Sequence, residues 1–163
     1  GISQGMQPII GFNYGARKYD RVKKTYFLAI ECELAITIIA VICFHLFPEY
    51  ILSIFGKGDE LYMEFSVKFM KCFLCALPLG AVQMLSSNLF ASIGKSVKGA
   101  LLSLTRQVIF FIPILFVLPI IYGINGLFWV GPTSDVLAFV TTIACVIHEF
   151  RHSDLSGKNL RLQ

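Results

Sequence analysis

Four runs of apolar residues, each longer than twenty residues, constrain most strongly what this sequence can fold into. About 20 apolar residues in a helix suffice to cross the hydrocarbon core of a bilayer. Apolar residues make up 56% of the 163-residue chain and charged residues only 15%, more apolar and less charged than soluble domains. A globule of this size cannot hide that surplus, so the sequence predicts an all-α, polytopic membrane helix bundle. The predicted spans are residues 26–47, 65–90, 100–122 and 127–150.

The ends of the chain differ from these four spans. Residues 1–16 are mostly apolar but too short to cross a bilayer. We interpret them as the end of a helix that begins upstream, which gives four full transmembrane helices plus part of a fifth. Residues 151–163 are hydrophilic and are predicted to form a tail outside the membrane.

The basic residues alternate along the chain in a way that predicts orientation. Residues 17–24 hold five Lys and Arg, the connection before the third span holds three when Arg106 is counted with it, and the tail holds three. Eleven of the fourteen therefore fall on one side, which is the cytoplasm by the positive-inside rule. We expect a multi-pass protein of the bacterial plasma membrane, with loop 17–24 and the C-terminus cytoplasmic. The lipid bilayer, and no nucleic acid, is the expected partner of this charge pattern.

Prolines interrupt three of the four predicted spans. Proline removes a backbone donor and clashes with the preceding turn, and membrane helices tolerate it where neighbours satisfy the freed carbonyls. We expect bent helices that enclose a cavity. The prolines concerned are Pro78, Pro113, Pro119 and Pro132.

Two short motifs suggest chemistry that the rest of the chain does not support. His148, Glu149 and His152 match H-E-x-x-H, in which two imidazoles bind zinc and the glutamate acts as a base. The sequence offers no convincing third ligand, so a membrane zinc metalloprotease is a minor alternative. Cys72 and Cys75 match C-x-x-C but lie among apolar residues, where packing is the simpler interpretation. We expect no enzyme activity, no metal and no cofactor.

One face of the second span is small, polar and aromatic instead of leucine-rich. Such residues allow close packing of helices or line a cavity, and the sequence leaves both interpretations open. An acid within a span is a functional candidate by default because its insertion is costly. The candidates for a substrate cavity are Gln83, Ser87, Phe90 and Asp135.

The opening sequence GISQGMQPIIGFNYGA, followed by basic residues, strongly resembles the multidrug and toxic compound extrusion (MATE) family, and most closely its bacterial MepA-like branch. Within it, Gly11 and Gly15 lie four residues apart and permit close helix packing, while Asn13 can bond a neighbouring helix. The likeness continues in LPLG (77–80), NLFASIGK (88–95), FIP (111–113), GINGLFW (123–129), Gly131-Pro132 and Asp135.

This resemblance implies a twelve-helix transporter of two lobes, of which the chain is a C-terminal fragment from the end of helix 8 to helix 12. Its members export amphipathic, often cationic compounds in exchange for Na⁺ or H⁺ by alternating access. The implied partners are small-molecule drugs or toxins and the missing N-terminal lobe.

One departure from the family bears on ion coupling. Some relatives carry a cation-binding aspartate three residues before Gln83, where this chain has Gly80. The coupling ion is therefore expected to bind in the missing lobe. Two further alternatives stay open: a non-catalytic membrane scaffold, and a related lipid-linked oligosaccharide flippase. The flippase should carry cationic side chains deep in its spans, and we expect none here.

Overall fold

The structure of the protein, a computed structural model, describes residues 1–55 and 59–152. Over these residues the secondary structure is helical, with no strand, so the predicted all-α fold is confirmed. The helices are α1 (Ile2–Gly15), α2 (Tyr19–Leu46), α3 (Pro48–Phe55), α4 (Glu60–Leu74), α5 (Leu77–Ser92), α6 (Ser96–Leu104), the π-helix η1 (Thr105–Phe111), α7 (Ile112–Tyr122) and α8 (Ile124–His152).

Three helical stretches are long and apolar enough to cross a membrane, and a bent pair makes a fourth. The three are α2, the continuous stretch α6–η1–α7, and α8. The second predicted span is not one straight helix, because α4 and α5 meet at an angle of 46°. Pro78 lies in the first turn of α5, where a missing N–H is tolerated and a new helix can begin.

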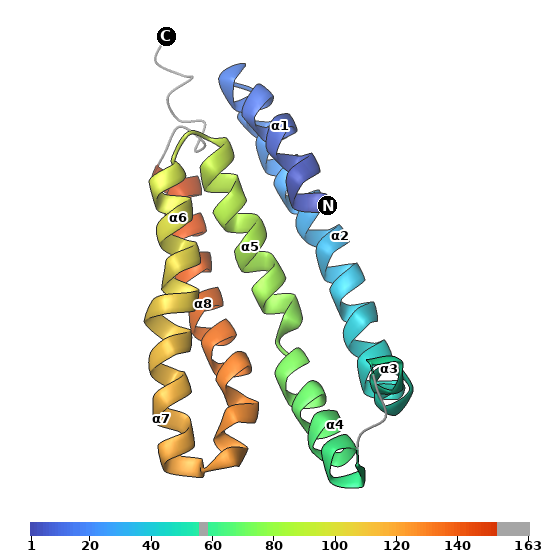
Figure 1. The fold of residues 1–163 in the computed structure, drawn as a ribbon. Coiled ribbons are helices and arrows are strands. Elements are labelled where there is room, and N and C mark those ends of the chain that lie inside the picture. The colour runs from blue at the N-terminus through green and yellow to red at the C-terminus, as the bar shows by residue number, and fades with distance from the viewer. Residues whose placement is uncertain (56–58, 153–163) are drawn as a thin grey trace.

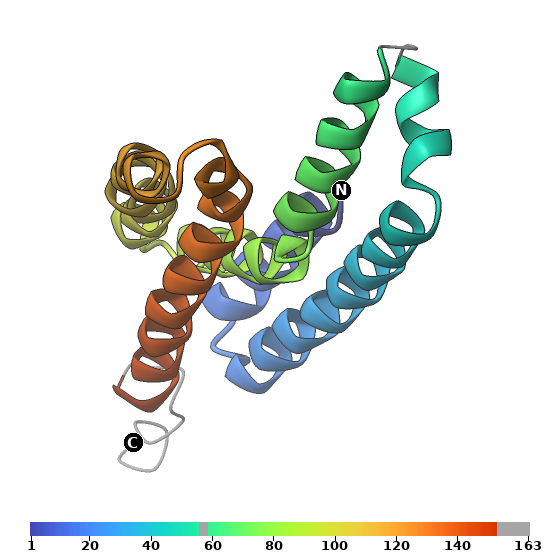
Figure 2. The ribbon, with the colours of Figure 1, turned by 90° about the horizontal axis from the view of Figure 1, so that it is seen from below.

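Helix α5 lies at the centre of the bundle. It packs against α1, α2, α6 and α8, so it separates the α1–α2 pair from the pair that α8 forms with α6, η1 and α7 (Figures 1 and 2). The chain reverses between α7 and α8 at Gly123, whose φ of +61° is a conformation that suits glycine. Helix α8 therefore begins at Ile124, three residues before the predicted span.

The connections that carry basic residues lie at one end of the bundle. The α1–α2 connection, the α5–α6 connection and the C-terminal end of α8 gather there, while α3 and the α7–α8 turn lie at the other end (Figure 1). This arrangement agrees with the predicted alternation of loops. Residues 153–163 of the predicted tail and Lys57 lie outside the described residues, and the compartment that each end faces stays a prediction.

Arg106 is a correction to the predicted charge pattern. It belongs to η1, ten residues beyond the start of α6, and not to the loop before the third span. Ten of the fourteen Lys and Arg, and not eleven, therefore fall in the connections assigned to one side. The expectation that no cation lies deep in the spans is wrong for the same reason.

Large apolar side chains cover the outside of the bundle, whereas polar contacts lie between helices. Phe116 and Ile120 on α7 are exposed by 67% and 84%, as suits a surface in contact with lipid. Inside, the hydroxyls of Tyr26 on α2 and Ser86 on α5 share a hydrogen bond of 2.7 Å. This hydrogen bond thus pairs two polar groups away from the lipid-facing surface.

Of the packing motif predicted in α1, only Gly11 lies close to a neighbouring helix. A Cβ on Gly11 would lie 3.5 Å from the Ser92 carbonyl oxygen of α5, but Gly15 has open space beside it. Asn13 donates to the Ile9 carbonyl of its own helix at 2.8 Å and does not bond a neighbouring helix. Its short side chain reaches the preceding turn more easily than another helix.

The polar link between α1 and α5 is made by Gln7 instead. Its amide nitrogen Nε2 donates to Asn88 Oδ1 at 2.9 Å, and the Asn88 amide nitrogen donates to the Ser3 hydroxyl. Two segments that carry the family resemblance, 1–16 and 88–95, therefore meet in the structure.

Replacing Gly99 with alanine is expected to lower the free energy of unfolding by about 1–3 kcal/mol, the usual cost of overpacking. A Cβ at this position would lie 2.5 Å from the Ser87 carbonyl oxygen, so α5 and α6 would have to separate. Gly5→Ala is the matched control, because Gly5 lies in α1 with nothing within 4 Å of its added Cβ. Unfolding in sodium dodecyl sulfate followed by circular dichroism measures both. Equal stabilities would contradict the close packing.

Candidate functional site

The strongest polar feature within the spans is an ion pair between α8 and η1. Arg106 Nε donates to Asp135 Oδ1 at 2.7 Å. The side chain of Asp135 is 8% exposed, while that of Arg106 is 36% exposed. Ionisable residues inside membrane segments are rare, pair with one another and mark functional sites by default.

A cavity of about 380 Å³ lies against this pair. Two phenyl rings and small polar groups complete its wall, so charge and aromatic surface adjoin one another. Aromatic faces attract cations and offer flat apolar contact. The lining residues are Phe73, Arg106, Gln107, Phe111, Gly131, Ser134 and Asp135.

Two glycines make room for the side chains of this site. A Cβ on Gly80 of α5 would lie 2.9 Å from Arg106 Nη2 and 3.5 Å from Asp135 Oδ2. A Cβ on Gly131 would lie 2.6 Å from the ring of Phe73. Any larger residue at position 80 would therefore push against the guanidinium, and one at position 131 against the ring.

The backbone around the site is irregular on two sides. Arg106 lies in η1, and single π-helical stretches in α-helices occur frequently at functional sites. Gly80 lies in the first turn of α5, just after the break between α4 and α5. Discontinuous helices at membrane depth commonly border binding sites in transporters.

Of the four predicted cavity residues, only Asp135 lines this cavity. Gln83 is 3% exposed and its amide Nε2 donates to the Leu102 carbonyl of α6 at 2.9 Å. Ser87 is 6% exposed and its carbonyl oxygen faces Gly99. For these two residues the geometry favours helix packing, which was the other interpretation of that face.

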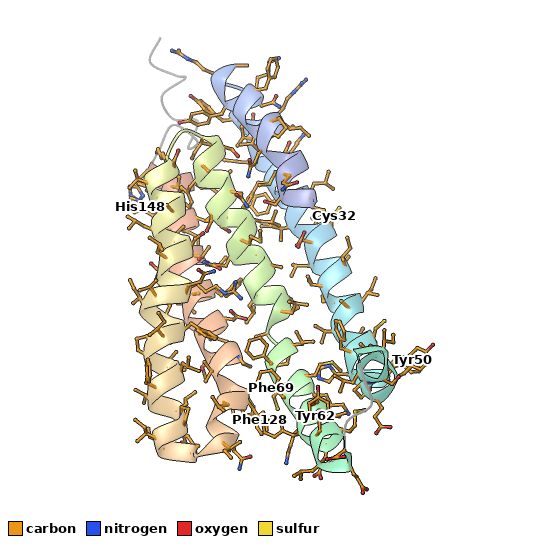
Figure 3. The ribbon with its side chains drawn as sticks, viewed as in Figure 1. Cys32, Tyr50, Tyr62, Phe69, Phe128 and His148 are labelled. Atoms are coloured by element: carbon orange, nitrogen blue, oxygen red, sulfur yellow. The ribbon has the colours of Figure 1, made fainter. Side chains whose placement is uncertain are left out.

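Phe90 borders a second cavity, of about 550 Å³, between α8 and α6–η1. Its other lining residues include Lys98, His148 and Glu149. The cavity lies near the end of the bundle where the basic connections gather; the label of His148 marks this end in Figure 3. Phe90 and Asp135 therefore belong to different cavities.

The H-E-x-x-H motif takes part in an ion-pair cluster. Glu149 is 2% exposed and accepts from Lys95 through Oε1, and its Oε2 lies 3.2 Å from Lys98 Nζ. The rings of His148 and His152 stack with centroids 4.7 Å apart. A glutamate held in this way between two lysines is not a free base, and the described residues contain no group of three or more His, Cys, Asp or Glu that could hold a metal.

Sequence reasoning missed the partner of Asp135, although a signal was present. Arg106 is the sole Lys or Arg between Lys98 and Arg151, and Asp135 is the sole acid between Glu64 and Glu149. A cation ten residues into a span needs a counter-charge at similar depth. That requirement alone pairs the two residues.

Comparison with known proteins gives one family. The MatE family profile matches residues 1–117. The multidrug export protein MepA of Staphylococcus aureus strain N315 is 23% identical over 129 residues, which cover 79% of this chain and 28% of that protein. The same protein of strain NCTC 8325 is 24% identical over 132 residues, with the same coverage.

Solved structures agree with this result. A multidrug resistance MATE family transporter of the MOP superfamily, in an inward-facing conformation, matches with a TM-score of 0.83 and 18% identity, over 96% of this chain and 36% of that one. A solved chain described as protein A matches with a TM-score of 0.82 and 35% identity, over 94% and 33%. The chain thus spans about a third or less of the length of these relatives. Since the family profile covers well over half of the sequence, this chain belongs to the MatE family of membrane transporters, whose members are not enzymes.

Proposed function

We propose that the chain forms part of the C-terminal lobe of a multidrug efflux transporter and that the cavity beside Arg106 and Asp135 belongs to its substrate path. The observation that carries this proposal is a partly buried ion pair in the spans that lies against an aromatic-lined cavity. The names of the MepA relatives and of the solved MATE transporter support multidrug export as the activity.

The proposed mechanism is alternating access. Two lobes rock about a central site, and binding of a coupling ion and of a drug favours opposite states. We propose Na⁺ or H⁺ as the coupling ion, bound by the N-terminal lobe. Loop 17–24 and the end of α8 would face the cytoplasm of a bacterial cell.

One observation favours the flippase alternative, which the sequence disfavoured because no cationic side chain was expected deep in the spans. Arg106 is a cation deep in a span, which a pyrophosphate-binding cavity would require. Its charge, however, is balanced by Asp135 at 2.7 Å. An acid directly against this cation disfavours a pyrophosphate, so drug export remains the better supported function.

Asp135→Asn in the full-length gene product is expected to weaken resistance to lipophilic cationic drugs, because the carboxylate beside the cavity is lost. Gln83→Ala is expected to weaken it less, through loss of the hydrogen bond to Leu102. Growth of a strain deprived of its own efflux pumps measures resistance, with membrane expression of each variant checked by immunoblot. Glu49→Gln, an acid removed from the exposed helix α3, is the matched control. Wild-type resistance in both variants would contradict the proposed site.

A further inference from the structure

The ion pair makes the cavity wall electrically neutral as a whole. Arg106 contributes one positive charge and Asp135 one negative charge, and the described lining holds no other Lys, Arg, Asp or Glu. In surroundings of low dielectric constant an uncompensated charge is costly. Each of the two residues therefore acts as the counter-ion that a charged ligand would otherwise supply.

One hydrogen bond joins the pair, so each group keeps polar atoms that this bond does not use. The hydrogen bond joins Nε and Oδ1, and in the described chain neither Arg106 nor Asp135 makes a second hydrogen bond to a side chain. A guanidinium has five donors and a carboxylate has two acceptor oxygens. Of these atoms, Arg106 Nη2 and Asp135 Oδ2 lie beside Gly80 of α5, which has no side chain to cover them, and both residues line the cavity.

Arg106 has room to move, whereas Asp135 does not. The Arg106 side chain is 36% exposed, against 8% for Asp135, and it stands on the wider turns of η1. A long arginine side chain can swing away from a fixed carboxylate by changing rotamers. A ligand with a positive charge could then take its place beside Asp135, in the cavity that Phe73 and Phe111 also line.

We propose that Arg106 is a built-in counter-cation that competes with lipophilic cations for Asp135, so that the pair sets the charge preference of this cavity. The proposal rests on the proposed function in that it takes the cavity to be part of a substrate path. Arg106 is then a specificity-determining residue: without it the site prefers cations, and without Asp135 it prefers anions.

Two probes of matched shape test this directly. Tetraphenylphosphonium and tetraphenylborate are lipophilic ions of nearly the same size and of opposite charge. Equilibrium binding of each radiolabelled ion is measured on the purified full-length gene product in lipid nanodiscs at neutral pH. Empty nanodiscs give the partition of each ion into lipid, and the ratio of the two dissociation constants is the readout.

Arg106→Gln is expected to shift this ratio at least about tenfold toward the phosphonium, and Asp135→Asn about tenfold toward the borate, which corresponds to about 1.4 kcal/mol for each. Arg106→Lys should stay near the wild-type ratio, since the charge is kept. Arg106→Gln with Asp135→Asn leaves a neutral pair that needs no counter-charge, and its ratio should return to within about twofold of wild type.

Lys24→Gln is the matched control, because it removes the same charge from an exposed position near the start of α2. Equal shifts in Lys24→Gln and Arg106→Gln, or an unchanged ratio in Arg106→Gln and in Asp135→Asn, would overturn the proposal. If either single variant fails to fold, the double variant still tests the proposal. A ratio of dissociation constants in the double variant that is far from the wild-type ratio would also overturn the proposal. Binding is measured apart from efflux, so a protein that shows these shifts but exports neither ion would refute the proposed function and not this inference.

Discussion

Asp135→Leu is expected to lower the free energy of unfolding by about 3 kcal/mol, the lower end of the cost of breaking a buried ion pair from one side. The loss arises because Arg106 would stay in the spans without its counter-charge. Its side chain is 36% exposed, which allows some relief through water or lipid headgroups and keeps the effect from being larger. No comparable loss is expected from acids on exposed turns.

A double-mutant cycle separates the pair from simple packing. Arg106→Met together with Asp135→Leu replaces both charges by apolar groups of similar size, and such replacements of buried pairs are often neutral or stabilising. The double variant should therefore regain most of the stability lost in Asp135→Leu. Titration with sodium dodecyl sulfate, followed by circular dichroism, gives the four free energies. Additive losses would show that the two side chains do not interact.

Removing both lysines of the second ion cluster is expected to have a similarly large effect. In Lys95→Met with Lys98→Met, the carboxylate of Glu149 loses the ammonium groups of Lys95 and Lys98, although its side chain is only 3% exposed. A loss of about 3 kcal/mol should follow. Either lysine variant alone should cost less, because the other ammonium group remains.

The same unfolding titration checks this expectation. Adding Glu149→Leu to the two lysine substitutions removes the buried carboxylate together with its two ammonium partners and should restore much of the loss. Lys18→Met with Lys24→Met removes two exposed charges next to and within the start of α2 and serves as the control. A double lysine variant no less stable than this control would show that the Glu149 cluster contributes little.

The spans could be predicted from the sequence because helices of this length and apolar content are solvated by lipid and not by water. The helices extend beyond two of the predicted spans at their starts: α6 begins at Ser96 and α8 at Ile124, each a few residues earlier, and the bounds of the membrane-crossing parts stay predictions. The reason is that polar and glycine residues at a helix end extend past the hydrocarbon core and carry no apolar signal. Pro78 predicted a bend, but not that two separate helices would meet there.

The candidate site was predicted less well than the fold. Asp135 stood out through its charge, whereas Arg106 was assigned to a loop because hydropathy averages over one cation in a long apolar run. For Gln83 and Ser87 the sequence was equally compatible with helix packing and with a cavity wall. Which neighbour a helix face meets is decided by tertiary packing, and here α6 covers that face through Gly99.

The break between α4 and α5 acts as a joint in the wall of the site. An intact helix resists bending through its continuous hydrogen bonds, but residues 75 and 76 stand outside both helices, so no continuous set of helical hydrogen bonds resists tilting at this point. The packing of α4 against α8 sets the angle. Phe73 belongs to α4, and its ring stacks on Phe69 and packs against Gly131 of α8. The other residues that line the cavity belong to η1 and α8. A tilt of α4 relative to α5 would therefore move the Phe73 ring toward or away from Arg106 and Asp135. The width of the cavity would then depend on the angle between α4 and α5.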